Sequence, residues 1–311
     1  MKAVIYDRKS KPDKLVFCDM DKPGPSDDEV LIKLHAVSLN AADYSSMQMG
    51  IIPKKKIFGA DVAGRIESAG KNISLFKPGD EVIGDLADYG FGGLAEYVTA
   101  PERALVVKPH GISFEEGAAL PMAAMTALQA LRNMAGVQKG KTVLIVGSAG
   151  GVGTYAVQLA RYFGAEVTGV CGPKNVKQTL SLGADHVIDY TKESIKESDK
   201  RYDIILGING NYPLLTYKKL LTSNGTYVMV GGSLSQIFKS LLFGWFLSFG
   251  SRKMKSLTAK TSIADLEFLL KLVGQGVIRP VIDRRYPLEK TAEAVSYLKQ
   301  GHSTGKVIIN I

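Results

Sequence analysis

The stretch VLIVGSAGGVGTYAVQLAR, residues 143–161, runs from apolar residues through a cluster of glycines into a helical pattern. Ser148, Gly150 and Gly153 occupy a G-x-G-x-x-G frame whose first glycine is replaced by serine. Gly150 would let the backbone approach a pyrophosphate, and Gly153 would let the helix pack against the strand. The start of the helix offers unpaired N–H groups and a positive dipole end to phosphates. A strand before this frame and a helix after it favour a dinucleotide site over a bare tight turn. The residues expected to face the dinucleotide there are Ser148, Ala149, Gly150, Gly151 and Val152.

The end of the next strand bears on which dinucleotide is bound. A site specific for NAD places Asp or Glu there to hold the ribose 2′-hydroxyl. This chain has Cys171-Gly172-Pro173-Lys174-Asn175 instead, without a carboxylate. Lys174 can reach a 2′-phosphate; the alternative is a solvated loop lysine. The missing acid and the present base together favour NADPH.

Strands and helices alternate around the glycine cluster. Apolar strand patterns at 142–146, 166–170, 186–188, 203–206 and 225–231 alternate with helical patterns at 152–164, 175–183 and 213–225. This rhythm predicts a doubly wound parallel sheet. The first 110 residues instead form short strands between Gly, Pro and Asp turns. After a helical pattern at 264–276, residues 279–311 predict strand, helix and strand, and we expect this tail to rejoin the N-terminal domain.

Composition excludes several classes of protein. The 311 residues carry a formal net charge of +9, but no dense Lys/Arg helix or zinc-finger spacing supports nucleic-acid binding. Two distant cysteines, Cys18 and Cys171, allow neither a disulfide framework nor a CxxC metal site, which favours a reducing, cytoplasmic location. No signal-peptide core or stretch of membrane-spanning length is apparent. A basic balance also suits an anionic small molecule or membrane surface.

Motifs along nearly the whole chain resemble the medium-chain dehydrogenase/reductases, in their zinc-independent quinone oxidoreductase branch, which includes chloroplast-envelope quinone-oxidoreductase-like proteins. The resemblance implies a GroES-like, mostly-β catalytic domain at 1–118 and 275–311, and a Rossmann NADP-binding domain at 119–274. It is carried by EVLIKLHAVSLNAADY (29–44), GADVAGRIESAG (59–70), KPGDEVIG (77–84), GGLAEYV (92–98), ALPMAAMTALQAL (119–131), SLGADHVIDY (181–190), GTYVMVGG (225–232), GHSTGKVII (301–309) and the glycine cluster.

The zinc members of this family hold a catalytic metal with Cys, His and Cys, with a Glu beside the His. The first of these positions is Asn40 here, and the His-Glu pair is Ala60-Asp61. No cysteine lies between Cys18 and Cys171, so the second thiolate is missing, as is the four-cysteine structural lobe. Zinc requires several N, S or carboxylate ligands, and only Asp61 remains. We therefore expect no metal.

Without zinc, nothing acidifies an alcohol, and reduction of a quinone or an activated C=C becomes the favoured reaction. The resemblance implies that Asn40 bonds the acceptor carbonyl or the nicotinamide ribose; Asp43 and Tyr44 follow it. Tyr44 is the best local candidate for a proton donor or a pocket wall. Alternatively, Asn40 forms a turn, Asp43 caps a helix and Tyr44 is an ordinary structural residue. Many relatives have Pro and Lys where this chain has Ala41 and Ser45, which leaves substrate preference open.

Further cofactor contacts are implied by the resemblance or by position. Thr126 resembles a residue against the nicotinamide, Tyr190 an aromatic beside the adenosine phosphate, and Lys306 a residue near the cofactor; each could instead be an ordinary structural residue. Asn209, Gly231 and Gly232 follow predicted strands, and ligands bind at the carboxyl ends of strands in open α/β sheets. The four histidines show no metal-like spacing.

Residues 204–264 contain no Asp or Glu but seven Lys and Arg residues. Within them, Phe243, Trp245 and Phe246 are expected to form an apolar wall of the substrate pocket. Because basic residues flank this aromatic stretch, peripheral contact with an anionic membrane is a second interpretation.

The sequence thus predicts an NADPH-dependent reductase of a small, apolar, electrophilic quinone or enone, without nucleic acid as a partner, and we expect a homodimer. The alternatives are an alcohol or aldehyde oxidoreductase, and a protein that senses NADPH without turnover.

Overall fold

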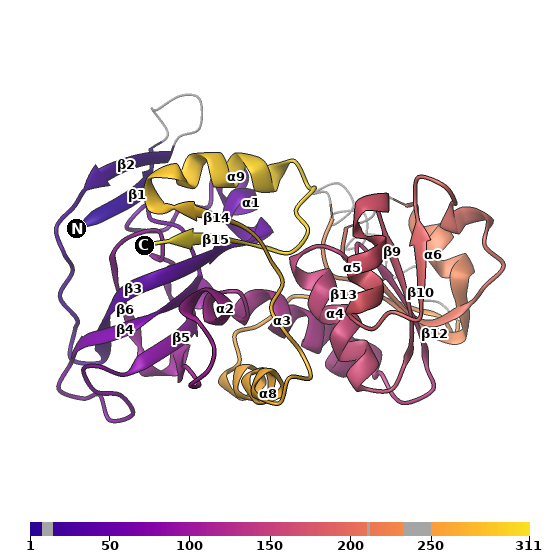
Figure 1. Ribbon diagram of the computed structural model, residues 1–311, viewed down its shortest axis with the longest axis horizontal. Helices are drawn as coiled ribbons and strands as arrows, with labels where there is room; N and C mark the ends of the chain where they lie inside the picture. The colour runs from indigo at the N-terminus through magenta and orange to yellow at the C-terminus, as the bar shows by residue number, and fades with distance from the viewer. Residues whose placement is uncertain (8–14, 210–211, 233–249) are drawn as a thin grey trace. The chain divides into compact units, whose positions relative to one another are not determined.

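The computed structural model describes residues 1–7, 15–209, 212–232 and 250–311, which form two compact units (Figure 1). The first unit comprises Met1–Met125, Thr261–Gly276 and Pro280–Ile311. The second comprises Thr126–Lys260 and Val277–Arg279. Residues 119–125 and 261–274 therefore group with the first unit, whereas the sequence predicts them within a Rossmann domain at 119–274.

The first unit is built mainly on antiparallel strands. In its described part, one sheet has the order β14-β15-β3-β4-β5-β7, with β6 paired to β3, and β1 pairs with β2. Its strands are β1 Lys2–Tyr6, β2 Leu15–Asp19, β3 Glu29–Leu39, β4 Asp61–Ala69, β5 Glu81–Asp85, β6 Tyr97–Pro101, β7 Leu105–Val107, β14 Ile282–Pro287 and β15 Lys306–Asn310. Its helices are α1 Ala41–Met49, α2 Phe114–Ala118, most of α3 Pro121–Leu128, α8 Ile263–Gly274 and α9 Thr291–Lys299.

The C-terminal tail rejoins the first unit, as the sequence predicts. Strand β15 pairs antiparallel with β3, so that Val307 lies opposite Leu39 and Ile309 opposite Val37. These four side chains are buried in one apolar core. The pairing also brings Lys306, at the start of β15, next to the end of β3, where Asn40 begins α1.

The second unit contains a parallel sheet of order β10-β9-β8-β11-β12-β13 in its described part. Its strands are β8 Thr142–Val146, β9 Glu166–Cys171, β10 His186–Asp189, β11 Tyr202–Gly207, β12 Leu221–Met229 and β13 Lys253–Ser256. Its helices are α4 Gly151–Tyr162, α5 Val176–Ser181 and α6 Leu214–Leu220, and a π-helix spans Gln129–Ala135. Central β8 is buried from Val143 to Val146, and α4 buries Gly153–Ala160. A buried strand followed by a half-buried helix is the arrangement that the glycine stretch predicted.

The structure differs from the sequence expectation in β13, which no sequence pattern predicted, and at the end of one helix. The helix predicted over 213–225 ends at Leu220, and β12 begins at Leu221. Asn224 and Gly225 are poor helix formers, and Gly225 lies so close to the Tyr202 carbonyl oxygen that a built Cβ would be 2.9 Å from it. Close packing of two strands therefore outweighs the local helical pattern there.

Candidate functional site

The glycine turn connects β8 to α4 in a tightly fixed conformation. The N–H groups of Gly147 and Ser148 both donate to the Val170 carbonyl oxygen, at 3.0 and 3.1 Å. The Ser148 side chain is fully buried and donates to the same oxygen at 3.2 Å. Serine in the first position of the frame therefore anchors the turn to β9, and this contact leaves its hydroxyl facing protein.

Gly153 and Gly150 are glycines for different reasons. A Cβ on Gly153 would lie 2.0 Å from the Gly147 carbonyl oxygen, so the turn and the helix can approach only without a side chain. A Cβ on Gly150 would meet no protein atom closer than 4.0 Å, and the residue has an extended backbone with φ −78°. Nothing within the described protein requires glycine at 150. The open space beside it, at a helix start without a side-chain cap, fits a bound pyrophosphate.

The end of β9 carries the residues expected to select the cofactor. Cys171 is buried, whereas Lys174 is exposed on the short helix Pro173–Asn175 that follows. Tyr190, after β10, is 54% exposed, and its hydroxyl would lie 3.0 Å from a Cβ built on Gly172. These groups therefore gather at the carboxyl ends of two paired strands.

A carboxylate also lies at this edge of the sheet, on the neighbouring strand. Asp189 is opposite Cys171 in the β9–β10 register. Its Oδ1 accepts from the backbone and the hydroxyl of Thr191, at 3.0 and 2.8 Å, and these bonds lower the pKa of Asp189. The Oδ1 oxygen of Asp189 is thus already hydrogen-bonded within its own turn.

The other predicted cofactor and pocket residues lie at separate places in the chain. The backbone of Asn209 packs on Gly147, whose built Cβ would be 2.8 Å from the Asn209 nitrogen, and the Asn209 side chain is exposed. Gly231 bonds back to the Gly207 carbonyl oxygen at 3.2 Å, and Gly232 has φ 133°. Thr126 is 8% exposed within α3. Phe243, Trp245 and Phe246 lie outside the described residues.

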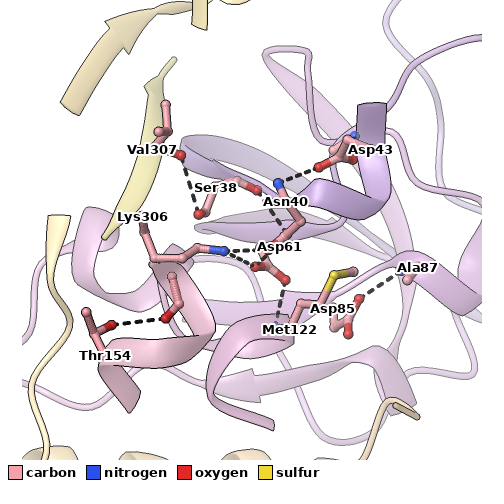
Figure 2. Close-up of polar contacts among 12 residues, drawn as sticks. Ser38, Asn40, Asp43, Asp61, Asp85, Ala87, Met122, Thr154, Lys306 and Val307 are labelled. Carbon is pink, nitrogen blue, oxygen red and sulfur yellow. Dashed lines mark hydrogen bonds and ion pairs between the residues drawn. The ribbon is translucent and has the colours of Figure 1, made fainter. Parts of the chain in front are cut away.

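The first unit contains a buried polar cluster that includes Asn40 and Asp61, which the resemblance aligns with the zinc-site positions (Figure 2). The Lys306 Nζ donates to Asn40 Oδ1 at 2.5 Å and to Asp61 Oδ2 at 3.2 Å. The Asn40 Nδ2 donates to the same Asp61 oxygen at 2.9 Å, which closes a ring of three side chains. All three are nearly inaccessible, with Asp61 at 0% and Lys306 at 3% exposure. We call Asn40, Asp61 and Lys306 the ion-pair cluster.

Asp61 has a second oxygen, which fixes the start of α3. Its Oδ1 accepts from the Met122 N–H at 3.0 Å. Burial raises the pKa of Asp61, while the Lys306 ammonium and the Asn40 amide act in the opposite direction. The carboxyl therefore joins β4, the end of β3, β15 and α3 within one unit.

Asp43 organises the first turn of α1. Its Oδ2 accepts from the Asn40 N–H at 2.8 Å, and its Oδ1 accepts from the Gly59 N–H at 3.1 Å. Burial raises the pKa of Asp43 to about 6, although these two bonds oppose the shift. The geometry agrees with the helix-capping interpretation of Asp43. Tyr44 is half-buried on the same helix and packs against the apolar core.

Sequence reasoning missed Asp85. In the β4–β5 register it lies directly opposite Asp61 and is 4% exposed. Burial, with a further contribution from the Asp61 charge, raises the pKa of Asp85 to about 7. Its Oδ1 accepts from the Ala87 N–H at 2.9 Å (Figure 2). A signal existed in the sequence, because both aspartates stand at ends of strand patterns that form an antiparallel pair.

The donor set does not fit a catalytic zinc ion. Among the described residues, no group of three or more His, Cys, Asp or Glu side chains could hold a metal. At the expected position, an ammonium and an amide surround the single carboxylate. Two of the three neighbours of a metal there would be an amide and a cation, which zinc does not bind.

Known proteins resemble both parts of the chain. The description "Alcohol dehydrogenase GroES-like domain" matches residues 26–110, and "Zinc-binding dehydrogenase" matches residues 182–309. The chloroplast envelope quinone oxidoreductase homolog of Arabidopsis thaliana is 36% identical, over 92% of this chain and 91% of the relative. An NADPH-dependent alkenal/one oxidoreductase of the same plant is 31% identical, over 99% of this chain and 79% of the relative. The solved quinone oxidoreductase of Coxiella burnetii has a TM-score of 0.89 and 29% identity, covering 100% and 99% of the two chains.

The fold and the glycine turn therefore place this chain among the medium-chain dehydrogenase/reductases, which are enzymes that use a nicotinamide cofactor. Within that family it belongs to the quinone oxidoreductase branch. None of the helices in the described ranges is long and apolar enough to cross a membrane.

Proposed function

We propose that this enzyme is a zinc-independent reductase that transfers hydride from NADPH to a quinone or an α,β-unsaturated carbonyl compound. The observation that carries the proposal is the ion-pair cluster. A buried lysine, bonded to Asp61 at 3.2 Å and to Asn40 at 2.5 Å, stands where an alcohol dehydrogenase needs a Lewis acid. Reduction of an electron-poor acceptor does not need that Lewis acid. The names of two relatives, a quinone oxidoreductase homolog and an alkenal/one oxidoreductase, point to the same acceptors.

The second unit would hold the dinucleotide through its own backbone. The N–H groups at the start of α4 face the open space beside Gly150 and would bind the pyrophosphate. Exposed Lys174 would pair with a 2′-phosphate, and exposed Tyr190 would lie beside the adenosine. Bound there, the cofactor supplies the hydride.

The first unit would orient the ligand and supply hydrogen bonds to it. Among the described contacts, two of the three N–H bonds of the Lys306 ammonium are used within the ion-pair cluster, so one is left to hold a ligand oxygen. The Asn40 amide has its oxygen on Lys306 and its nitrogen on Asp61 and on the Ser38 carbonyl. This argues that Asn40 positions the lysine, and that Lys306 is the better candidate to contact a ligand.

The reaction needs one proton besides the hydride. Hydride addition to a quinone gives a hydroquinone anion, and hydride addition to the β-carbon of an enone gives an enolate; each takes up one proton. Tyr44, on the helix that Asp43 anchors, is our candidate to deliver or relay it. Water is the alternative proton source.

The test is a panel of quinones, enones, aldehydes and alcohols, assayed with NADPH and NADH before and after treatment with EDTA. Turnover of quinones or enones with NADPH that survives EDTA supports the proposal. Turnover restricted to alcohols or aldehydes would replace it with the alcohol oxidoreductase alternative. Cofactor binding without turnover on any acceptor would favour a sensor.

Two further expectations concern the cellular form of the enzyme. We expect a cytoplasmic homodimer. Light scattering of the purified protein tests the dimer, and a mass of one chain at micromolar concentration would contradict it.

A further inference from the structure

The segment from the end of α1 to the bridge at Ile57 exposes Met49, Ile51 and residues 54–56, whereas Ile52 packs against the core and Pro53 is buried. Tyr6 holds both of its ends: the Tyr6 hydroxyl donates to the Met47 carbonyl oxygen at 3.3 Å, and the Tyr6 N–H donates to the Lys56 carbonyl oxygen at 2.7 Å. Ile57 bridges to Ile5 and is 2% exposed. Both ends of the segment are therefore fixed to β1 in the first unit.

The exposed part of this segment combines apolar and cationic side chains. Met49 is 53% exposed and Ile51 is 58% exposed, on either side of the left-handed Gly50 that ends α1. A turn closed by the Lys56 N–H and the Pro53 carbonyl oxygen, at 2.8 Å, then presents Lys54, Lys55 and Lys56, all exposed. We call Met49, Ile51, Lys54, Lys55 and Lys56 the basic–apolar tip.

The lysines of the tip are not neutralised by the protein. In the ranges that the structure describes, none of the three forms an ion pair with a carboxylate. The sequence from Tyr44 to Ala60 contains no Asp or Glu at all. The positive charge is therefore available to an external anionic surface.

We propose that the basic–apolar tip docks this enzyme reversibly on an anionic lipid surface, with Met49 and Ile51 entering the headgroup region and the three lysines pairing with lipid phosphates. Lysines next to exposed aliphatic side chains suit a lipid interface. The tip contains no Trp, Tyr or Arg, which are the residues that dominate protein–protein contacts. This inference does not depend on which acceptor the enzyme reduces.

The expected affinity is weak and sensitive to salt. Each lysine close to an anionic surface strengthens binding about fivefold, so three contribute roughly a hundredfold at low ionic strength. Screening at high salt removes most of this gain. No spanning helix is needed for binding of this kind.

The experiment is sedimentation of the purified full chain with vesicles of pure phosphatidylcholine and of phosphatidylcholine with phosphatidylglycerol. The test variant is Lys54→Gln with Lys55→Gln and Lys56→Gln. The matched control is Lys192→Gln with Lys271→Gln and Lys299→Gln, three exposed lysines whose loss lowers the net charge from +9 to +6 equally. A third variant, Met49→Ser with Ile51→Ser, tests the apolar part. Circular dichroism melting confirms that each variant folds.

The proposal expects the wild type to bind anionic vesicles at low salt, the test variant to bind roughly a hundredfold less, and the control to lose no more than a few-fold. The apolar variant should lose about tenfold. Equal losses in the test and control variants would overturn it, because net charge alone would then be responsible. Absence of binding to anionic vesicles by the wild type would also overturn it and would leave an acidic protein as the partner to seek.

Discussion

The two candidate sites differ in how they use their polar groups. In the first unit, the ion-pair cluster is closed: Asp61 accepts from Asn40, Lys306 and Met122, and the Asn40 amide is bonded at both ends. In the second unit, the glycine turn is open: Gly150 has empty space beside it and the helix start has no side-chain cap. The polar groups of the closed site have partners within the protein, whereas the open site has room for an anion. Substitutions in the ion-pair cluster should therefore reduce stability, whereas a substitution at the open space beside Gly150 should reduce ligand binding.

The largest effect is expected for Lys306→Met. It leaves the buried Asp61 carboxylate without its cation, and breaking a buried pair on one side typically costs about 3–5 kcal/mol. Adding Asp61→Asn to this variant should restore most of the loss, because no buried charge then remains. The free energy of unfolding from urea titration measures both.

Lys108→Met is the matched control for this comparison. Lys108 is also buried, but its partner Glu81 is partly exposed, at 29%, and can be hydrated when the lysine is lost. Its loss should cost less than that of Lys306. A loss of under 1 kcal/mol for Lys306→Met would show that the cluster is not an intact ion pair.

The second effect is a pH dependence of stability that arises at Asp85, which lies opposite Asp61 of the closed site. Burial raises the pKa of Asp85 from 3.8 to about 7, so the folded protein keeps a proton there that the unfolded chain releases. The free energy of unfolding should therefore fall as pH rises from about 4 to about 7, by an amount on the order of 2–4 kcal/mol. Asp85→Asn cannot ionise and should remove most of this fall. A smaller fall up to about pH 6 should remain, because burial also raises the pKa of Asp43 to about 6. Urea titrations at pH 5 and pH 8 measure the difference.

Asp88→Asn removes the same charge from an exposed position three residues away and is the control. It should keep most of the pH dependence of the wild type, because the Asp88 charge makes only a small contribution to the raised pKa of Asp85. If Asp85→Asn keeps it as well, then Asp85 is ionised in the folded protein and the closed site tolerates its charge.

Most of the fold could be predicted from the sequence, because local patterns encode it. The glycine turn, the strand–helix alternation after residue 141 and the return of the tail to the first unit are all present in the structure. The helix predicted to run to 225 was too long, because packing of Gly225 against the Tyr202 strand outweighed a local preference.

The candidate sites were predictable to different degrees. The glycine turn lies within one short stretch, so its residues were all identifiable. The ion-pair cluster joins residues 40, 61 and 306, which only the β15–β3 pairing brings together. Lys306 was therefore expected near the cofactor by resemblance alone, and Asp85 was not expected at all. Register across strands is the information that the sequence pattern lacks.

The third prediction compares two substitutions within the open site. Gly153→Ala places a Cβ 2.0 Å from a carbonyl oxygen and should destabilise the protein by about 1–3 kcal/mol. Gly150→Ala meets nothing within the protein closer than 4.0 Å and should leave the melting temperature unchanged while weakening NADPH binding. Thermal melting and a fluorescence titration with NADPH distinguish the two. If Gly150→Ala binds NADPH as the wild type does, the open space beside Gly150 is not a phosphate site.

The smallest effect is expected at the edge of the open site, where Lys174 is exposed and water screens its charge. Lys174→Ala should weaken NADPH binding about tenfold and leave NADH binding unchanged, because only NADPH carries the 2′-phosphate that a charge-assisted bond would hold. Lys177→Ala, an exposed lysine three residues further on, is the matched control and should affect the two cofactors equally. Fluorescence titrations of each variant with both cofactors give the ratio of affinities. Equal losses for NADPH and NADH at Lys174 would remove this residue from cofactor selection. The absence of a carboxylate at the end of β9 would then be the only feature of that strand end that favours NADPH.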